Sequence, residues 1–184
     1  MCGEQGPLAD GAAPCTSAVD PTGAGLGRVL AVGEACPPVR FEPLSDEADG
    51  GVEIGPGGQE GPVLLVFWSI FCPTCMEELS RIEEVARACS RYGVRTVGVN
   101  VDGARYRAVV ERYMRARRVA FDRVALDAVA AEGPVGARAL GVAGTPGWVL
   151  VDRAGRLVWR AEGRLSRQAL EKALGRMSTR DAGG

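Results

Sequence analysis

The chain has 184 residues, of which 46% are hydrophobic and 24% are charged, and its formal net charge is −1. This length and composition predict one globular domain with an ample core and give no reason to expect a second domain. Lys172 is the only lysine among the 22 basic residues, a bias that indicates codon usage more than a nucleic-acid partner. No apolar run approaches the roughly 20 residues that span a bilayer, and no signal peptide is visible.

The first 26 residues are rich in Gly, Ala, Pro, Ser and Thr and show no hydrophobic periodicity. Such a segment cannot bury enough surface to order itself, so we expect a flexible tether over residues 1–28, a folded domain over 29–177 and a disordered tail over 178–184. Met1-Cys2-Gly3 resembles the mature start of a bacterial lipoprotein, although an ordinary cysteine near a start codon explains these residues equally well. Any membrane attachment would therefore be through a lipid on Cys2.

The most informative stretch couples a buried strand to two cysteines. Residues 62–68 (PVLLVFW) are an apolar run that predicts a strand buried on both faces, with a helix directly after it. Pro73 suits the first helical position, because its missing N–H would have no partner there, and Cys72 is then the N-cap. The unpaired N–H groups and the helix dipole favour a thiolate at Cys72, the candidate nucleophile. Cys75 falls one turn later on the apolar face, so we expect a buried, resolving thiol.

Three other interpretations of the C-x-x-C spacing remain open. A structural disulfide would restrain the unfolded chain little, because the closed loop is short. A zinc half-site lacks a histidine and a second C-x-x-C pair to complete four ligands, and we expect neither a metal nor a cofactor. The third is a pair that has lost its redox role. A strand, a C-x-x-C pair and a helix in succession favour redox chemistry over all three.

The rest of the chain predicts an alternating α/β domain. The expected elements are strands at 52–54, 94–101, 124–126, 148–152 and 156–161, and helices at 73–91, 104–118, 135–140 and 165–177. Their order implies a mixed central β-sheet with helices on both faces. The helix over 104–118 carries six arginines, for which a solvated face is the favoured interpretation and docking to an acidic partner is the alternative.

These motifs carry a family resemblance. PVLLVFWSIFCPTCMEEL, together with Gly144-Thr145-Pro146 before a second apolar strand, resembles the thioredoxin superfamily, and within it the TlpA/ResA-like branch of extracytoplasmic thiol-disulfide oxidoreductases. The similarity covers about residues 32–177. It implies a thioredoxin-like fold and a cis Thr145-Pro146 bond beside the dithiol, with the backbone before the proline free to pair with substrate. The expected substrate-docking residues are Trp68, Pro73, Thr74, Thr145 and Pro146.

Glu78 is the third candidate catalytic residue, after Cys72 and Cys75. It lies where the TlpA/ResA-like branch has an active-site carboxylate, three residues beyond Cys75. Val66 occupies the place where thioredoxins keep a buried Asp, so Glu78 is the nearest group able to take the proton of Cys75. A plain surface glutamate is the alternative interpretation.

Several residues depart from the family pattern. Phe71 replaces the usual Trp, Met76 replaces a basic residue, Ser80 replaces a Pro that often kinks the helix, and Gly147-Trp148 replaces Thr-Thr. These departures concern client specificity and redox potential rather than the dithiol chemistry. Cys36 stands where a small residue usually precedes proline, and it is either a tolerated small hydrophobe or the disulfide partner of Cys15.

The predicted reaction is thiol-disulfide exchange with client proteins that carry cysteine pairs. The resemblance favours a monomeric reductase for cytochrome c or copper-site maturation, in the periplasm or on the outer face of the cytoplasmic membrane, with a membrane thiol transporter as electron donor. Two other classes remain open. A peroxiredoxin-like peroxidase would use the motif Pro-x-x-x-Thr/Ser-x-x-Cys, in which Ser69 fits the second part but Leu65 occupies the proline position. A copper-binding module of the Sco type would require one more residue between the cysteines, and also a histidine, which the chain lacks.

Overall fold

The computed structural model describes residues 30–45, 50–58 and 60–181. The predicted tether over 1–28, with Cys2 and Cys15, and the last three residues of the predicted tail lie outside the described residues. Among the helices that are described, none is long and apolar enough to cross a membrane.

A mixed seven-stranded sheet forms the centre of the domain, with the strand order β2-β1-β5-β4-β3-β8-β9. Its strands are β1 (Val39–Pro43), β2 (Val52–Ile54), β3 (Val63–Trp68), β4 (Arg95–Asn100), β5 (Arg123–Leu126), β8 (Gly147–Val151) and β9 (Leu157–Glu162). A separate hairpin, not predicted from the sequence, pairs β6 (Val129–Ala130) with β7 (Gly133–Pro134). The helical elements are α1 (Pro73–Leu79), α2 (Ile82–Ser90), the 3-10 turn η1 (Ala104–Tyr106), α3 (Arg107–Arg117), α4 (Val135–Ala139) and α5 (Arg167–Asp181).

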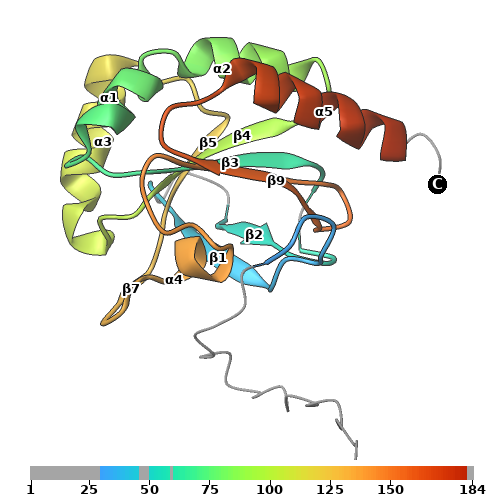
Figure 1. Ribbon diagram of the computed structural model, residues 1–184. Coiled ribbons are helices and arrows are strands. Elements are labelled where there is room, and N and C mark those ends of the chain that lie inside the picture. Colours follow the sequence, from blue (N-terminus) through green and yellow to red (C-terminus); the bar gives the residue numbers. More distant parts are fainter. Residues whose placement is uncertain (1–29, 46–49, 59, 182–184) are drawn as a thin grey trace, which may run out of the picture.

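The helices cover both faces of this sheet (Figure 1). Alternation along β3 explains how they do so, because all six of its residues are buried and successive side chains point to opposite faces. Leu65 and Phe67 join the apolar cluster on the side of α4, whereas Leu64 and Val66 join the cluster on the side of α2 and α5. The predicted α/β thioredoxin-like fold and the doubly buried strand are both confirmed.

The neighbours of β3 bring distant segments to one end of the sheet. β3 runs parallel to β4 and antiparallel to β8, with Phe67 opposite Gly147. The end of β3 therefore lies beside the start of β8, where the Thr145-Pro146 bond is found. A Cβ on Gly147 would lie 2.4 Å from Cγ1 of Val142, so this close approach requires a glycine.

The prediction of a single helix over 73–91 is wrong, because the structure has two helices there, α1 and α2. The hydroxyl of Ser80 donates to the carbonyl oxygen of Glu77 at 2.6 Å, and the N–H of Arg81 bonds the carbonyl of Glu78 only three residues back. A hydroxyl that bonds the preceding turn bends a helix. Ser80 therefore breaks the helix where the resembled family often has a proline.

Two other helix boundaries also differ from those predicted. The helix expected to begin at residue 104 starts as the 3-10 turn η1 before it becomes α3. α5 continues to Asp181, so residues 178–181, which were expected to fray, extend the helix instead.

Candidate active site

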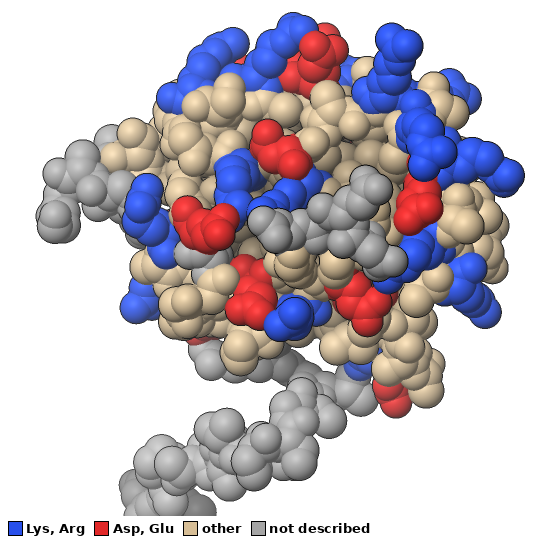
Figure 2. Space-filling model, turned by 180° about the vertical axis from the view of Figure 1, so that it is seen from behind, with Lys and Arg blue, Asp and Glu red and all other residues tan. Residues whose placement is uncertain are grey.

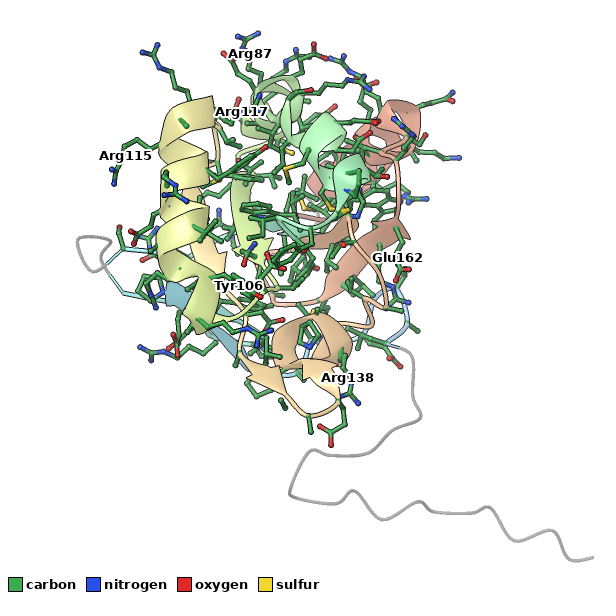
Figure 3. All side chains as sticks on the ribbon, turned by 90° about the vertical axis from the view of Figure 1, so that its left-hand side faces the viewer. Arg87, Tyr106, Arg115, Arg117, Arg138 and Glu162 are labelled. Carbon is green, nitrogen blue, oxygen red and sulfur yellow. A yellow bond between two sulfur atoms is a disulfide. The ribbon has the colours of Figure 1, made fainter. Side chains whose placement is uncertain are left out.

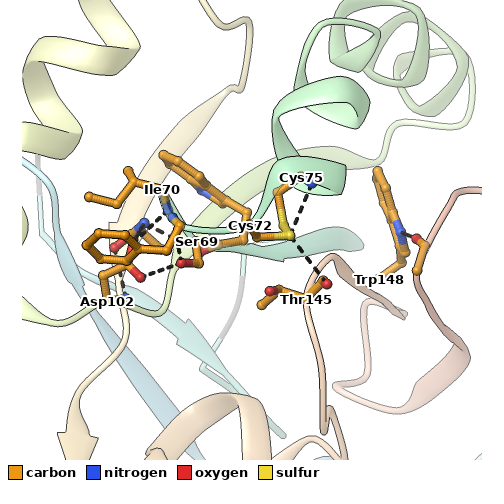
Figure 4. Close-up of a disulfide and its surroundings, with 11 residues drawn as sticks. Ser69, Ile70, Cys72, Cys75, Asp102, Thr145 and Trp148 are labelled. Atoms are coloured by element: carbon orange, nitrogen blue, oxygen red, sulfur yellow. Dashed lines mark hydrogen bonds between the residues drawn. A yellow bond between two sulfur atoms is a disulfide. The ribbon is translucent and has the colours of Figure 1, made fainter.

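The two cysteines of the C-x-x-C pair form a disulfide at the start of α1 (Figure 4). Their Cα atoms are 5.2 Å apart. Cys72 is the N-cap of α1, Pro73 begins the helix, and the backbone N–H of Cys75 donates to Sγ of Cys72 at 3.1 Å. Cys72 is half-buried and Cys75 is fully buried. The predicted N-cap and the predicted difference in burial between the two sulfurs are confirmed.

The Thr145-Pro146 bond is cis, as expected, and it lies against the dithiol. The carbonyl oxygen of Thr145 is 3.4 Å from Sγ of Cys72. Pro146 is buried, whereas Thr145 is half-buried and Gly144 before it is exposed. The backbone before the proline is therefore open to solvent immediately beside the sulfur of Cys72.

The end of β9 supports this proline loop. Oε1 of Glu162 accepts the N–H of Ala143 at 2.7 Å, and the N–H of Gly163 donates to the carbonyl of Pro146 at 2.8 Å. The buried indole of Trp148 donates in turn to the carbonyl of Gly163 at 2.9 Å.

Asp102 is a residue of the site that sequence reasoning missed. Its carboxylate accepts the hydroxyl of Ser69 at 2.5 Å, the N–H of Ile70 at 2.8 Å and the side-chain amide of the buried Asn100 at 2.7 Å. The hydroxyl oxygen of Ser69 accepts the N–H of Phe71 at 3.0 Å. Asp102 therefore fixes the segment that leads into Cys72 (Figure 4). The sequence did contain a signal for this contact, because Ser69 and Asp102 each directly follow a predicted strand.

Glu78 is buried on the same side of α1 as Cys75, and only 5% of it is exposed. Its Oε2 accepts the N–H of Leu165, just before α5, at 3.4 Å. Val66, which stands where thioredoxins keep a buried Asp, is itself buried in the apolar cluster of α2 and α5. Glu78 also borders a small cavity between α2 and α5 that Arg81 helps to line. The glutamate is therefore not a plain surface residue.

The expected docking residues divide into two groups. Pro73 is exposed and Thr74 is half-buried, so both flank the accessible side of the disulfide. Trp68 is fully buried and packs against Tyr113, with ring centroids 5.8 Å apart. Its burial contradicts the expectation that Trp68 contacts clients directly. The exposed aromatic ring beside the dithiol is instead Phe71, which is 65% exposed.

The other two cysteines in the described part of the chain, Cys36 and Cys89, are free and buried. Burial, together with the nearby negative charge of Asp152, raises the pKa of Cys36 to about 11. Burial, with a smaller contribution from Asp122, raises the pKa of Cys89 to about 12. The proposed disulfide partner of Cys36, Cys15, lies outside the described residues.

A C-x-x-C disulfide at a helix start, set against a cis-proline loop at one end of a mixed sheet, defines a thioredoxin-like protein with a redox dithiol. The Redoxin family model matches residues 31–174. The chain belongs to the redoxin family, and it is a thioredoxin-like thiol-disulfide oxidoreductase.

Solved structures share the fold over nearly their whole length. The thiol:disulfide interchange protein assigned as DsbE in Chlorobium tepidum is 22% identical, with a TM-score of 0.62 over 81% of this chain and 99% of that one. A thio-disulfide isomerase from Thermus thermophilus is 25% identical, with a TM-score of 0.58 and coverage of 80% and 97%. StoA from Bacillus subtilis is 22% identical, with a TM-score of 0.56 and coverage of 75% and 98%. This likeness agrees with the TlpA/ResA-like resemblance of the sequence.

Two observations concern the alternative classes. Ser69, which fitted part of the peroxidase motif, uses its hydroxyl both to donate to Asp102 and to accept from Phe71. In the described ranges, no three Cys, Asp or Glu side chains gather as the ligands of a copper site would.

The burial of the four described cysteines predicts their order of alkylation in the reduced protein. At pH 8 a thiol with a pKa of about 11 is about one part in a thousand thiolate. We therefore expect iodoacetamide to modify Cys72 first and to leave Cys36 and Cys89 unmodified until the chain is unfolded in urea. Peptide mapping by mass spectrometry measures this order. Modification of Cys75 before Cys72, or of Cys36 as fast as Cys72, would contradict it.

Proposed function

We propose that the protein reduces disulfides in client proteins through Cys72 and Cys75. One observation carries the exchange chemistry: Cys72 is half-buried, its Sγ accepts a backbone N–H and lies 3.4 Å from the carbonyl oxygen of Thr145, while Cys75 is fully buried. A client can therefore reach one sulfur and not the other. This asymmetry is what a two-step exchange requires. The reducing direction is taken from the family resemblance.

The exchange begins with the reduced protein. The thiolate of Cys72 attacks one sulfur of the client disulfide, a mixed disulfide forms, and the other client sulfur leaves as a thiolate that takes up a proton. Cys75 then loses its proton and attacks Sγ of Cys72. The second client sulfur leaves as a thiolate and takes up a proton, so the client has gained two electrons and two protons, and the protein holds the Cys72–Cys75 disulfide seen in the structure.

We assign the backbone of Thr145 and the ring of Phe71 as the surfaces that hold the client during this reaction. Thr145 and Gly144 offer an open edge next to Cys72, and an extended client segment can pair with such an edge through backbone hydrogen bonds. Phe71, which directly precedes Cys72, offers exposed apolar area. Pro73 and Thr74 complete the rim.

Glu78 would serve as the base for Cys75 in the second step. It is buried one turn beyond Cys75 on the same side of α1, where it borders the small cavity between α2 and α5. A buried thiol needs a nearby acceptor for its proton, because water does not reach it freely. Glu78 supplies a carboxylate there.

The resemblance suggests the setting of the reaction. We propose an extracytoplasmic monomer, lipid-anchored through Cys2, that acts on cysteine pairs in proteins of cytochrome c or copper-site maturation. A membrane thiol transporter would return it to the reduced form, and no nucleic acid takes part.

The reduction potential of the Cys72/Cys75 couple indicates the direction of exchange. If the protein is a reductant, equilibration of the Cys72/Cys75 couple with dithiothreitol or glutathione should give a value near that of thioredoxin, about −270 mV. A value near that of DsbA, about −120 mV, would mean that the protein oxidises its clients instead.

A trapping experiment tests the roles of the two cysteines. Cys75→Ser leaves Cys72 able to attack and removes the thiol that releases the client, so mixed disulfides should accumulate. In an extract of the native cell envelope, this variant should capture a small set of proteins that contain cysteine pairs. Non-reducing gels and mass spectrometry identify them.

The matched control for the trap is Cys72→Ser, which should capture few proteins or none because Cys75 is buried. Cys2, Cys15, Cys36 and Cys89 are first changed to Ser in both variants to prevent unrelated adducts. Equal capture of the same proteins by the two variants would refute the assignment of the nucleophile.

Glu78→Gln tests the proposed base. The substitution keeps the size of the side chain and an acceptor for the N–H of Leu165, so we expect the fold to remain intact. Resolution of a preformed mixed disulfide should slow by about 10²-fold or more at neutral pH, and its pH dependence should change. Stopped-flow rates across the pH range provide the measurement. An unchanged profile would show that Glu78 does not accept the proton.

A further inference from the structure

The segment η1–α3 exposes a run of arginines that the proposed chemistry does not use. We call the exposed members the arginine face: Arg105, Arg112, Arg115, Arg117 and Arg118. Glu111, the only acidic residue between Ala104 and Arg118, is half-buried. Arg107 is not part of the face, because its guanidinium donates to the carbonyls of Pro43 and Leu44 and pairs with Glu42.

Several arginines near the other helices are paired instead. Ion pairs join Arg87 to Glu83 on α2, Arg164, which lies before α5, to Glu77 of α1, and Arg167, the first residue of α5, to Glu84 of α2. In the part of the chain that the structure describes, no ion pair involves a member of the arginine face. Arg105 and Arg117 lie instead over the rings of Tyr106 and Tyr113. Positive charge is therefore left uncompensated on one side of a protein whose net charge is −1.

The surface views agree with this segregation. In Figure 2, acidic and basic side chains are interspersed over the centre of the face shown, whereas basic side chains prevail along the right-hand margin, the side on which α3 lies. Figure 1 shows α3 on the same side of the molecule as α1, at whose start the disulfide lies, and Figure 3 shows Arg115 and Arg117 on that side.

A chain of contacts connects the arginine face to the reactive sulfur. The guanidinium of Arg105 lies 4.8 Å from the centre of the Tyr106 ring, and that ring meets Phe71 edge-on with centroids 5.1 Å apart. Phe71 directly precedes Cys72. A partner bound at Cys72 therefore covers Phe71 first and Arg105 next.

We propose that the arginine face docks clients that carry acidic side chains beside their cysteine pair. This inference rests on the proposed function, because it assigns a class of client to the same dithiol. Guanidinium groups bind carboxylates through paired hydrogen bonds, and a one-signed surface next to a reactive group raises the rate of productive encounters with the opposite charge. The face thus selects clients by charge before the sulfurs meet.

A protein client fits the arrangement better than an anionic membrane does. The end of the face at Arg105 is connected through Tyr106 to Phe71, so a membrane lying against this end would also obstruct the approach of clients to Cys72. A client segment that spans Cys72 and α3 meets no such conflict.

The test uses two synthetic peptides with the same internal disulfide, one flanked by glutamates and the other by lysines. The reduced protein is mixed with each peptide at ionic strengths of about 0.01 M and about 0.15 M, where screening lengths are about 30 Å and about 8 Å. At low salt we expect the acidic peptide to be reduced about tenfold faster than the basic one. The ratio should fall toward one as salt is raised. Stopped-flow rate constants give the ratio directly.

Two triple variants with the same change in charge locate the effect. Arg105→Gln, Arg112→Gln and Arg115→Gln together remove three charges from the arginine face and should abolish most of the preference. Arg91→Gln, Arg153→Gln and Arg176→Gln remove three exposed charges from the C-cap of α2, the β8–β9 turn and α5, and should leave the preference intact. A variant with lower overall activity would reduce both peptides more slowly by the same factor. The ratio of the two rate constants would therefore still measure the contribution of docking.

The outcomes separate this inference from the proposed function. Reduction of both peptides at equal rates, or a preference that survives in the arginine-face variant, overturns the docking surface while leaving the reductase intact. Failure to reduce either peptide overturns both. Binding to vesicles that contain phosphatidylglycerol, lost in the arginine-face variant and unaccompanied by any peptide preference, would assign the face to a membrane and overturn the proposal.

Discussion

The position of β3 between β4 and β8 is the constraint on which the whole site depends. The antiparallel partner places the start of β8 beside the end of β3, and the parallel partner places the end of β4 there as well. Three loops that are far apart in sequence therefore meet at one end of the sheet. A slip of one residue in this register would turn the side chains of a fully buried strand to the wrong faces, so the arrangement is strongly specified.

At that end of the sheet, the short helix α1 gives the sulfurs of Cys72 and Cys75 different roles. The N-cap position leaves Cys72 at the surface, and a single turn is enough to seal Cys75 inside. The next turn brings Glu78 to the same buried side before Ser80 ends the helix. The accessible sulfur, the protected sulfur and the carboxylate thus follow from helical periodicity over seven residues.

Features encoded locally could be predicted from the sequence. The apolar run of β3, the proline after Cys72 and the C-x-x-C spacing indicated the strand, the cap and the dithiol, and the family resemblance added the cis bond before Pro146. The bonds of Asp102 were not predicted, because the sequence shows only that Ser69 and Asp102 each follow a strand, and the bonds also require β3 and β4 to be adjacent. Periodicity also gave no sign that the Ser80 hydroxyl would bond the preceding turn.

The errors at Trp68 and at the β6–β7 hairpin have physical reasons too. Trp68 ends a strand whose two faces are both covered, so proximity to the cysteines in sequence does not bring its ring to the surface. β6 and β7 have two residues each, which is too short for an alternating pattern to appear.

The two sealed thiols lie in different layers of the molecule. Cys36 belongs to the apolar cluster on the α4 side of the sheet, and Cys89 belongs to the cluster beneath α2 and α5. Neither sulfur can meet an oxidant until its own layer opens, so the rate at which each one reacts measures a local opening equilibrium. The reactivities of Cys36 and Cys89 therefore report separately on the opening of the two sides of the sheet.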